Sequence, residues 1–233
     1  MPVVWLEPEV NSRFPPLEDA VEDGLLAAGG DLSTARLLNA YQQGIFPWFG
    51  KDDPILWWSP NPRMVLYTDK IKVSKSLKKT LRTSSISVTI DHAFEQVITA
   101  CSLPRNDQNT DSENSTWIHP DMIDAYIKLH QQGHAHSVEC WYEGQLVGGL
   151  YGVAIGNMFF GESMFSQMKD SSKIALVTLC QQLHKWGFPL IDCQVYSSHL
   201  ESLGAEEIAR NDFMQQITPL CQQAGLVSAW ALD

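Results

Sequence analysis

The chain of 233 residues is long enough for one large domain or two smaller ones, each able to bury a core. Its content of 44% hydrophobic and 18% charged residues is typical of a globular protein and argues against disorder. A net charge of −11 excludes a surface that is positive throughout, but it leaves room for a local basic patch.

The first residues, MPVVWLEPEV, lack the basic and apolar regions of a signal peptide. No apolar run approaches the roughly 18 residues that a membrane-spanning helix needs. The cysteines form no CxxC pair and lie at 101, 140, 180, 193 and 221. Scattered thiols of this kind suit a reducing compartment. We therefore expect a soluble cytoplasmic protein, and no feature of the sequence demands more than a monomer.

The first sixty or so residues are rich in turns. Prolines and glycines cluster at 14–16, 29–30, 46–50 and 59–62. One helix is predicted inside this region, beginning after Ser33 as its N-cap and ending at Gly44. We expect residues 1–62 to form a small, loop-rich N-terminal domain and residues 63–233 to form a larger domain.

The larger region begins with strands predicted at 64–67 and 86–90. Asp91 is placed to cap a helix, and the polar run at 105–115 predicts a loop. Pro120 suits the first turn of a further helix, which Gly133 ends.

Three short apolar runs follow, separated by the turn-like segments EGQ and IGN. They predict a three-stranded antiparallel meander over 136–142, 146–154 and 157–163. A helix at 172–186, a strand from Leu190, a short helix and a final helix complete the pattern. This order predicts an α+β fold in which the larger domain has the plan of an N-acyltransferase (acetyltransferase-like, GNAT-like) domain.

The stretch LIDCQV at 190–195 places Asp192 and Gln194 at alternate positions of a strand. Alternate residues of a strand point to one face, so we expect this acid and this amide to lie together. Cys193 would then point to the opposite face and pack in the core. On spacing alone, a buried hydrogen-bond network explains the pair as well as a functional site does.

Several motifs occur in a fixed order along the chain. They are GGDLS at 29–33, YQQGIFPWF at 41–49, LWWSPNPR at 56–63, GHAHSVE at 133–139, LVGGLYGV at 146–153, FFGESMFS at 159–166, SK at 172–173 and LIDCQV at 190–195. Through them the chain resembles the leucyl/phenylalanyl-tRNA–protein transferase family over most of residues 14–205.

Members of that family transfer leucine or phenylalanine, and sometimes methionine, from aminoacyl-tRNA to the α-amine of proteins that begin with Arg or Lys. The product is marked for degradation, as an N-degron. The resemblance implies a small N-terminal domain joined to a GNAT-like acyltransferase domain. It implies aminoacyl-tRNA, held through its acceptor end, and proteins with basic N-termini as partners, and no cofactor.

The resemblance also implies a catalytic group made of Asp192, Gln194 and Glu162. Gln194 would contact the reacting amine, and Asp192 would polarise this amine or receive its proton. Glutamine cannot act as a base, so its part must be hydrogen bonding. An ordinary aspartate is a weak base unless burial or a neighbouring carboxylate tunes it. Glu162 would recognise the basic side chain of the acceptor, and the alternative is an exposed glutamate at a strand end.

A donor pocket for leucine or phenylalanine is the next implication of the resemblance. Its expected lining is Trp48, Trp117, Leu150, Phe159, Met164, Ser166 and Leu179. Aromatic rings and an adaptable methionine suit both branched and aromatic groups. Leu150 and Leu179 stand where the family pattern has Met and Phe, which leaves the preference among Leu, Phe and Met open. Core packing is the alternative for any one of these residues, above all for Leu179.

A run of six cations contains no acid: Lys70, Lys72, Lys75, Lys78, Lys79 and Arg82. A helix beginning near Ser74 would place the last four on one stripe and turn Leu77 and Leu81 toward the core. Contact with the phosphates of the tRNA acceptor end is the favoured function, because counterion release drives such binding. A solvated lysine-rich face is the alternative.

Several weaker sequence patterns remain, and structural roles explain most of them. His134 and His136 have no cysteine or carboxylate at ligand spacing, so we expect no metal site. Cys193 and the nearby His199 suggest a thiol nucleophile, but strand alternation turns the thiol to the core. Trp57 and Trp58, with Trp48, either stack on the terminal base of the tRNA or close the seam between domains.

Two rival functions stay open at this point. A CoA-dependent N-acetyltransferase would share the fold, but such enzymes carry a QxxGxG loop where the fourth strand meets the long helix. This chain has SQMKDSSKIA at 166–175, which contains no glycine. A module that only binds N-terminal residues would need the acidic pocket, but neither the basic run nor the donor pocket.

Overall fold

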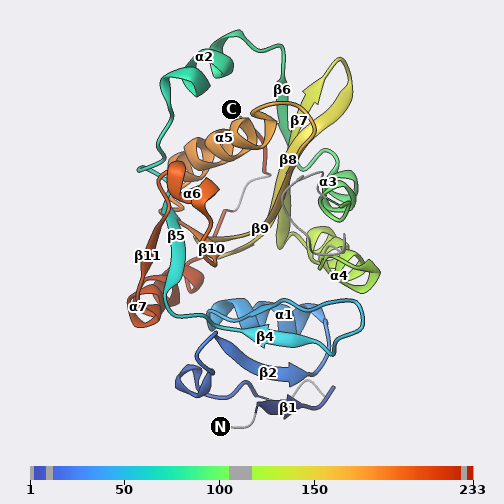
Figure 1. The fold of residues 1–233 in the computed structure, drawn as a ribbon, viewed down its shortest axis with the longest axis vertical. Helices are drawn as coiled ribbons and strands as arrows, with labels where there is room; N and C mark the ends of the chain where they lie inside the picture. Colours follow the sequence, from blue (N-terminus) through green and yellow to red (C-terminus); the bar gives the residue numbers. More distant parts are fainter. Residues whose placement is uncertain (1–2, 9–12, 105–116, 227–229, 233) are drawn as a thin grey trace.

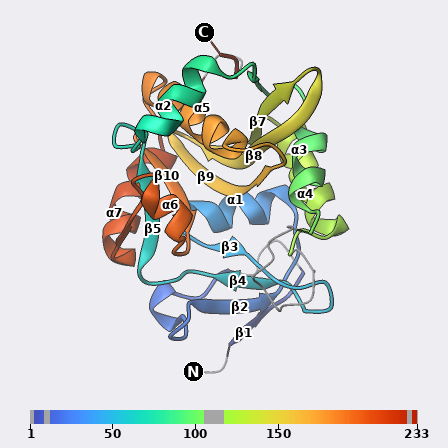
Figure 2. The ribbon, with the colours of Figure 1, turned by 45° about the horizontal axis from the view of Figure 1, so that its top comes forward.

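The structure is a computed structural model that describes residues 3–8, 13–104, 117–226 and 230–232. Two β-sheets lie one below the other, with helix α1 between them and helices on both faces of the larger sheet (Figures 1 and 2). The loop predicted at 105–115 lies outside the described residues. No helix among those that are described is long and apolar enough to cross a membrane.

The N-terminal sheet has four strands in the order β1-β2-β4-β3. They are β1 (Val4–Leu6), β2 (Leu25–Gly29), β3 (Phe46–Pro47) and β4 (Leu56–Trp58), with a 3₁₀ turn at Leu17–Asp19. Helix α1 (Thr34–Gln42) begins at Ser33 as predicted, because the Ser33 hydroxyl accepts a hydrogen bond from the Arg36 amide. The region is therefore small and rich in loops, as expected, and its short strands form a sheet of their own.

The larger sheet has seven strands in the order β11-β5-β10-β9-β8-β7-β6. They are β5 (Arg63–Tyr67), β6 (Ser87–Ile90), β7 (Ala135–Tyr142), β8 (Gln145–Ile155), β9 (Met158–Ser166), β10 (Leu190–Gln194) and β11 (Glu206–Ile208). β7, β8 and β9 form the predicted antiparallel meander. β10 is parallel to β9 and antiparallel to β5, so it joins the meander to the rest of the sheet.

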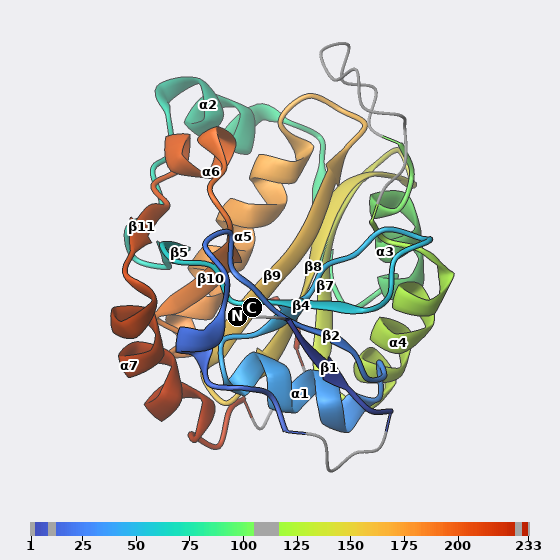
Figure 3. The ribbon, with the colours of Figure 1, turned by 60° about the horizontal axis from the view of Figure 1, so that its bottom comes forward.

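Six helices accompany this sheet in the described part of the chain. They are α2 (Lys75–Thr83), α3 (Phe94–Cys101), α4 (Pro120–Gln131), α5 (Ser171–Lys185), α6 (Ser198–Ser202) and α7 (Arg210–Cys221). Figure 3 shows α3 and α4 on one side of the meander and α5 on the other. The α+β plan, with a small N-terminal unit before the larger one, is confirmed, while the division at residue 62 stays a prediction.

Two apolar cores result from this layering. One packs α1, α3, α4 and α7 against the face of the sheet that includes Tyr151 and Phe160. The other lies under α5 and includes Leu150, Phe159 and Leu179. Phe159 and Phe160 are neighbours in β9, so their side chains alternate between the two cores.

The prediction that Asp91 caps α3 is wrong. Asp91 has a left-handed backbone with φ +58°, and its carboxylate instead holds His136 Nδ1 at 2.7 Å and accepts the Ser137 amide at 2.9 Å. The buried Glu139 carboxylate takes its place, because it accepts the amides of His92 and Ala93 just before the helix. A carboxylate from a neighbouring strand can satisfy these amides as well as a local cap does.

Candidate functional site

A cavity of about 1160 Å³ opens where two parallel strands separate. β9 and β10 pair only from Met158–Phe160 to Leu190–Asp192, and the chain beyond each of these segments lines the cavity. Residues of α5, α6 and the segment around β3 complete the lining. The cavity therefore reaches both sheets.

Each of the two strands carries an irregularity at the point of separation. The β8–β9 register shifts so that Tyr151 faces Ser163 while Gly152 faces Gly161, which leaves Glu162 as an extra residue. The β10–β5 register shifts between Asp192 and Gln194. Such bulges bend a strand and re-aim its side chains. They bring polar groups to the cavity from strands whose other residues are apolar.

The expected alternation along LIDCQV holds as far as Cys193 and is interrupted before Gln194. Cys193 packs against the core under α5, as expected, and also borders the cavity, whereas Gln194 has φ +58°. Asp192 and Gln194 nevertheless lie together, because the Gln194 amide N–H donates to Asp192 Oδ1 at 3.0 Å. The bulge thus brings Asp192 and Gln194 together, which strand alternation was expected to do.

Asp192 is completely buried and forms a two-pronged ion pair with Arg63. Arg63 Nε donates to Oδ1 at 2.8 Å, and Arg63 Nη2 donates to Oδ2 at 2.6 Å. The guanidinium also donates to the Gly44 carbonyl at 3.1 Å and lies 4.8 Å from the ring centroids of Phe46 and Phe213. Both carboxylate oxygens are thus occupied, as a buried charge requires.

The Gln194 side chain bridges the two separating strands. Its Nε2 donates to the Gly161 carbonyl at 2.6 Å, so the orientation of the amide is fixed. Among the described residues no donor reaches Gln194 Oε1. The amide therefore offers a fixed hydrogen-bond acceptor at the cavity wall.

Glu162 is held by two tyrosines from different parts of the fold. Tyr41 of α1 donates to Oε1 at 2.7 Å, and Tyr126 of α4 donates to Oε2 at 3.1 Å, while the two hydroxyls also contact each other. Burial raises the pKa of Glu162 to about 8, with a further contribution from the nearby Asp192, and the tyrosine hydrogen bonds and Arg63 oppose this rise. The carboxyl group is thus poised to change its charge near neutral pH.

All the residues expected in the donor pocket line this cavity: Trp48, Trp117, Leu150, Phe159, Met164, Ser166 and Leu179. Leu150, Phe159 and Leu179 are at most 3% exposed and form its apolar floor. Gly152 leaves room for this floor, since a Cβ there would lie 2.5 Å from the Phe159 ring. The Ser166 hydroxyl instead bonds the Met168 carbonyl and Ser171, which ties β9 to the start of α5.

The tryptophans around β4 have separate roles. Trp57 is fully buried and its indole N–H donates to the Gly29 carbonyl at 2.9 Å, so it belongs to the core of the N-terminal sheet. Trp58 donates to the Trp48 carbonyl at 2.6 Å, and their ring centroids are 5.7 Å apart. Trp48 is 42% exposed at the cavity, so it is the ring that a ligand can reach.

The basic run lies outside the cavity, on and before α2. All six cations are exposed, Ser74 caps the helix and Leu77 is buried, as predicted. Lys70 is 3.8 Å from Glu206 and lies over the Tyr67 ring, so it is less free than the others. α2 packs against α5, which lines the cavity.

The described residues include no group of three or more His, Cys, Asp or Glu side chains that could hold a metal ion. Burial raises the pKa of the Cys193 thiol well above its usual value, which opposes a thiolate nucleophile. Sequence reasoning missed Arg63, Tyr41 and Tyr126. A signal for Arg63 exists, because a cation at the start of an apolar strand needs a carboxylate partner when buried.

A family model described as leucyl/phenylalanyl-tRNA protein transferase matches residues 65–218, and the model of its N-terminal domain matches residues 30–61. The chain is 56% identical to the leucyl/phenylalanyl-tRNA–protein transferase of Nitrosomonas eutropha, over 96% of this chain and 94% of the relative. It is 52% identical to that of Nitrosospira multiformis, over 99% and 97%. A solved GCN5-related N-acetyltransferase from Kribbella flavida is similar with a TM-score of 0.38 and 13% identity, over 71% of this chain and 57% of that chain.

Proposed function

Because the chain belongs to the leucyl/phenylalanyl-tRNA–protein transferase family, whose members are aminoacyltransferases, we propose that it transfers leucine or phenylalanine from aminoacyl-tRNA to proteins that begin with Arg or Lys. Methionine is a further donor to be tested. The product would carry a destabilising N-terminus and enter the N-degron pathway of the cytoplasm, and the enzyme would act as a monomer.

The observation that carries this proposal is the lining of the cavity, which is apolar on one side and acidic on the other. The apolar floor of Leu150, Phe159 and Leu179 suits the side chain of the donor amino acid. Trp48 and Trp117 stand at the same cavity, where they can stack on the terminal base. This arrangement places the uncharged donor side chain on the apolar side of the cavity and the basic acceptor on its acidic side.

The acceptor is bound through its basic side chain and its α-amine. Glu162 recognises the basic side chain of the first residue, since its carboxylate can ionise when a cation enters the cavity. Gln194 Oε1 accepts a hydrogen bond from the α-amine and turns the lone pair of the nitrogen toward the ester. A protein that begins with an uncharged residue would leave Glu162 without a partner.

The reaction is an aminolysis of the ester that joins the amino acid to the terminal ribose. The neutral α-amine attacks the ester carbonyl, an amide bond forms, and the bond to the ribose oxygen breaks. That oxygen leaves as a hydroxyl, with the proton that the amine loses. The amine has a pKa of about 8, so a useful fraction is neutral and orientation supplies much of the rate.

Asp192 acts by position and charge in this proposal. Both of its oxygens already accept hydrogen bonds from Arg63, which stabilises the carboxylate and opposes its use as a base. Its carboxylate accepts the backbone N–H of Gln194, which helps to fix the position of this residue, and its negative charge helps the cavity to hold a cation. The expectation that Asp192 receives the proton is therefore replaced by a role in aligning Gln194.

The exposed cations of α2 bind phosphates of the acceptor end. The chain is acidic overall, so this local basic helix directs the tRNA to one end of the molecule. Affinity for donor tRNA should then fall steeply as salt concentration rises.

A transfer assay tests the function directly. Labelled Phe-tRNA, Leu-tRNA and acetyl-CoA are each supplied with peptides that differ only in beginning with Arg, Lys or Gly. We expect label on the Arg and Lys peptides from both charged tRNAs, little on the Gly peptide, and none from acetyl-CoA. Transfer from acetyl-CoA alone would make the protein an acetyltransferase, and binding of Arg peptides without any transfer would make it a recognition module.

A further inference from the structure

The first turn of α5 is open, although the helix is long enough to have a strong N-terminal dipole. Asp170 occupies the N-cap position, with φ +66°, and its side chain accepts no capping hydrogen bond. Its carboxylate is instead 3.5 Å from Lys173 Nζ. Among the described residues, the amides of Ser172 and Lys173 have no acceptor. Open amides at a helix N-terminus favour an anion.

Ser172 gives a second and independent observation. Its side chain is only 7% exposed and it lines the cavity. No residue in the described part of the chain accepts from or donates to its hydroxyl. By contrast the neighbouring Ser171 hydroxyl bonds the carbonyls of Val147 and Met168. A largely buried serine whose hydroxyl is open to a cavity and has no protein partner is placed to bind a ligand.

His199 of α6 also lines the cavity. Partial burial, and then the positive charge of Lys173 in the first turn of α5, lower the pKa of His199. At neutral pH the ring is uncharged and offers one N–H donor. The ion pair with Asp170 leaves the surroundings of Lys173 close to neutral. An anion would therefore be bound here by neutral hydrogen-bond donors rather than by a free positive charge.

The α5 residues that line the cavity give the distance between the start of α5 and the donor pocket. Ser172, Leu176 and Leu179 form one stripe along α5. Seven residues of helix span about 10 Å, which is comparable to the breadth of one nucleoside with its ester. The polar end of the stripe therefore lies one nucleoside away from the apolar end.

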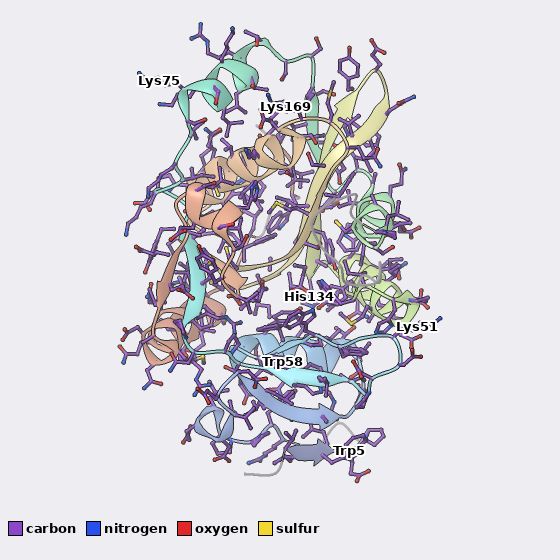
Figure 4. All side chains as sticks on the ribbon, viewed as in Figure 1. Trp5, Lys51, Trp58, Lys75, His134 and Lys169 are labelled. Atoms are coloured by element: carbon purple, nitrogen blue, oxygen red, sulfur yellow. The ribbon has the colours of Figure 1, made fainter. Side chains whose placement is uncertain are left out.

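We propose that Ser172, His199 and the open amides of α5 bind the phosphodiester that precedes the 3′-terminal nucleotide of the donor tRNA. This inference rests on the proposed function and names the contact that places the terminal nucleotide. The RNA reaches this point from α2: Figure 4 labels Lys75 on α2 and Lys169 in the turn before α5, both at the end of the molecule opposite the N-terminal sheet.

Two minimal donors separate the phosphate from the rest of the substrate. The first is 3′-O-phenylalanyl-adenosine, which has no phosphate, and the second is phenylalanyl-CpA, which has the one phosphodiester in question. The full chain is assayed with each donor and a peptide that begins with Arg. We expect KM for phenylalanyl-CpA to be about tenfold lower than KM for phenylalanyl-adenosine, because hydrogen bonds to a charged group are the stronger ones.

The variants Ser172→Ala and His199→Gln identify the residues. Each should raise KM for phenylalanyl-CpA about three- to tenfold and leave KM for phenylalanyl-adenosine unchanged. Ser198→Ala is the matched control, since Ser198 is exposed in the same short helix as His199 but does not line the cavity. It should change neither value.

Several results would overturn the inference. Equal KM values for the two donors in the unsubstituted protein would show that the phosphate contributes nothing. An equal loss with both donors in the two variants would assign Ser172 and His199 to the aminoacyl pocket. CoA could instead inhibit transfer from phenylalanyl-adenosine while the CpA phosphate gives no gain. That result would mean that Ser172, His199 and the α5 amides bind a coenzyme. If charged tRNA and both minimal donors all fail, the proposed function fails with the inference.

Discussion

Glu162 shows how strongly the pKa of a single residue depends on its surroundings. An unfolded glutamate ionises around pH 4.5, whereas in the folded protein burial raises the pKa of Glu162 to about 8. Between these values the folded chain holds a proton that the unfolded chain has lost. The stability linked to this proton is complete below pH 4.5 and is lost as the pH rises through about 8.

Replacing Glu162 by Gln should remove this dependence. The amide keeps the shape of the protonated acid and cannot ionise, so the variant should gain thermal stability relative to the unsubstituted protein as the pH rises from 6 toward 9. Melting temperatures measured at intervals of pH check the point. Two parallel curves would mean that Glu162 is ionised throughout in the folded state. The same variant should lose its preference for peptides that begin with Arg.

Substitutions of Asp192 and Arg63 can separate the contribution of this ion pair to stability from its contribution to transfer activity. Asp192→Asn leaves Arg63 buried without its counter-charge, which should lower the free energy of unfolding by about 3–5 kcal/mol. The double variant Arg63→Met with Asp192→Leu removes both charges and should recover much of that stability, but not the transfer activity. Urea unfolding and single-turnover transfer rates measure the two effects. Recovery of activity in the double variant would show that the charge of Asp192 has no chemical role.

The residues expected at the site lie at one cavity, whereas the residues that hold them in place were not predicted. Asp192, Gln194 and Glu162 are polar residues in apolar strands, which marks them in the sequence. Tyr41 and Tyr126 look like ordinary core residues of amphipathic helices, because the carboxylate that they meet lies in another strand. A pairing of this kind depends on the tertiary fold and leaves no local signal.

At the level of elements, helices were predicted better than the details of strands. The caps at Ser33 and Ser74 and the proline at the start of α4 are local signals, and the structure has them where they were expected. A bulge depends on the partner strand as well as on its own residues. The shifts beside Glu162 and Gln194 therefore could not be predicted, although they aim the side chains of the site.

The exposed cations of helix α2 should determine how strongly the affinity for donor tRNA depends on salt concentration. Replacing Lys78 and Lys79 by Gln should weaken donor tRNA binding and reduce the slope of log affinity against log salt by up to about 2. Lys51→Gln is the control, since Lys51 lies far from α2 at the N-terminal sheet (Figure 4). Filter binding at several salt concentrations gives the slopes. An unchanged slope in the double variant would leave α2 as a solvated face.

At the scale of the whole molecule, the last described residues return to the core. Trp230 stacks on His136 with ring centroids 3.7 Å apart, and it also contacts Trp186 and Phe188 after α5. It lies 5.9 Å from the Phe159 ring, which forms part of the floor of the cavity. Residues near the end of the chain thus support the floor of the cavity from behind.

Trp230→Ala should therefore lower the free energy of unfolding by about 2–3 kcal/mol, through the lost ring contacts. Trp5→Ala is the matched control, because Trp5 is 62% exposed on β1, and it should change the stability by no more than about 0.5 kcal/mol. Chemical denaturation of the two variants makes the comparison. A similar small effect for both would mean that the end of the chain contributes little to the fold.

Arg63 connects parts of the chain that are made at different times. It holds the carbonyl of Gly44, which the ribosome releases early, and the carboxylate of Asp192, which it releases late. Before β10 has emerged, Arg63 has no counter-charge, and the cavity has neither Asp192 nor Gln194. An unfinished chain that stops short of residue 192 therefore has no complete site. With the proposed site, activity is expected only after most of the polypeptide has been synthesised and folded, so incomplete molecules should not attach amino acids to other proteins.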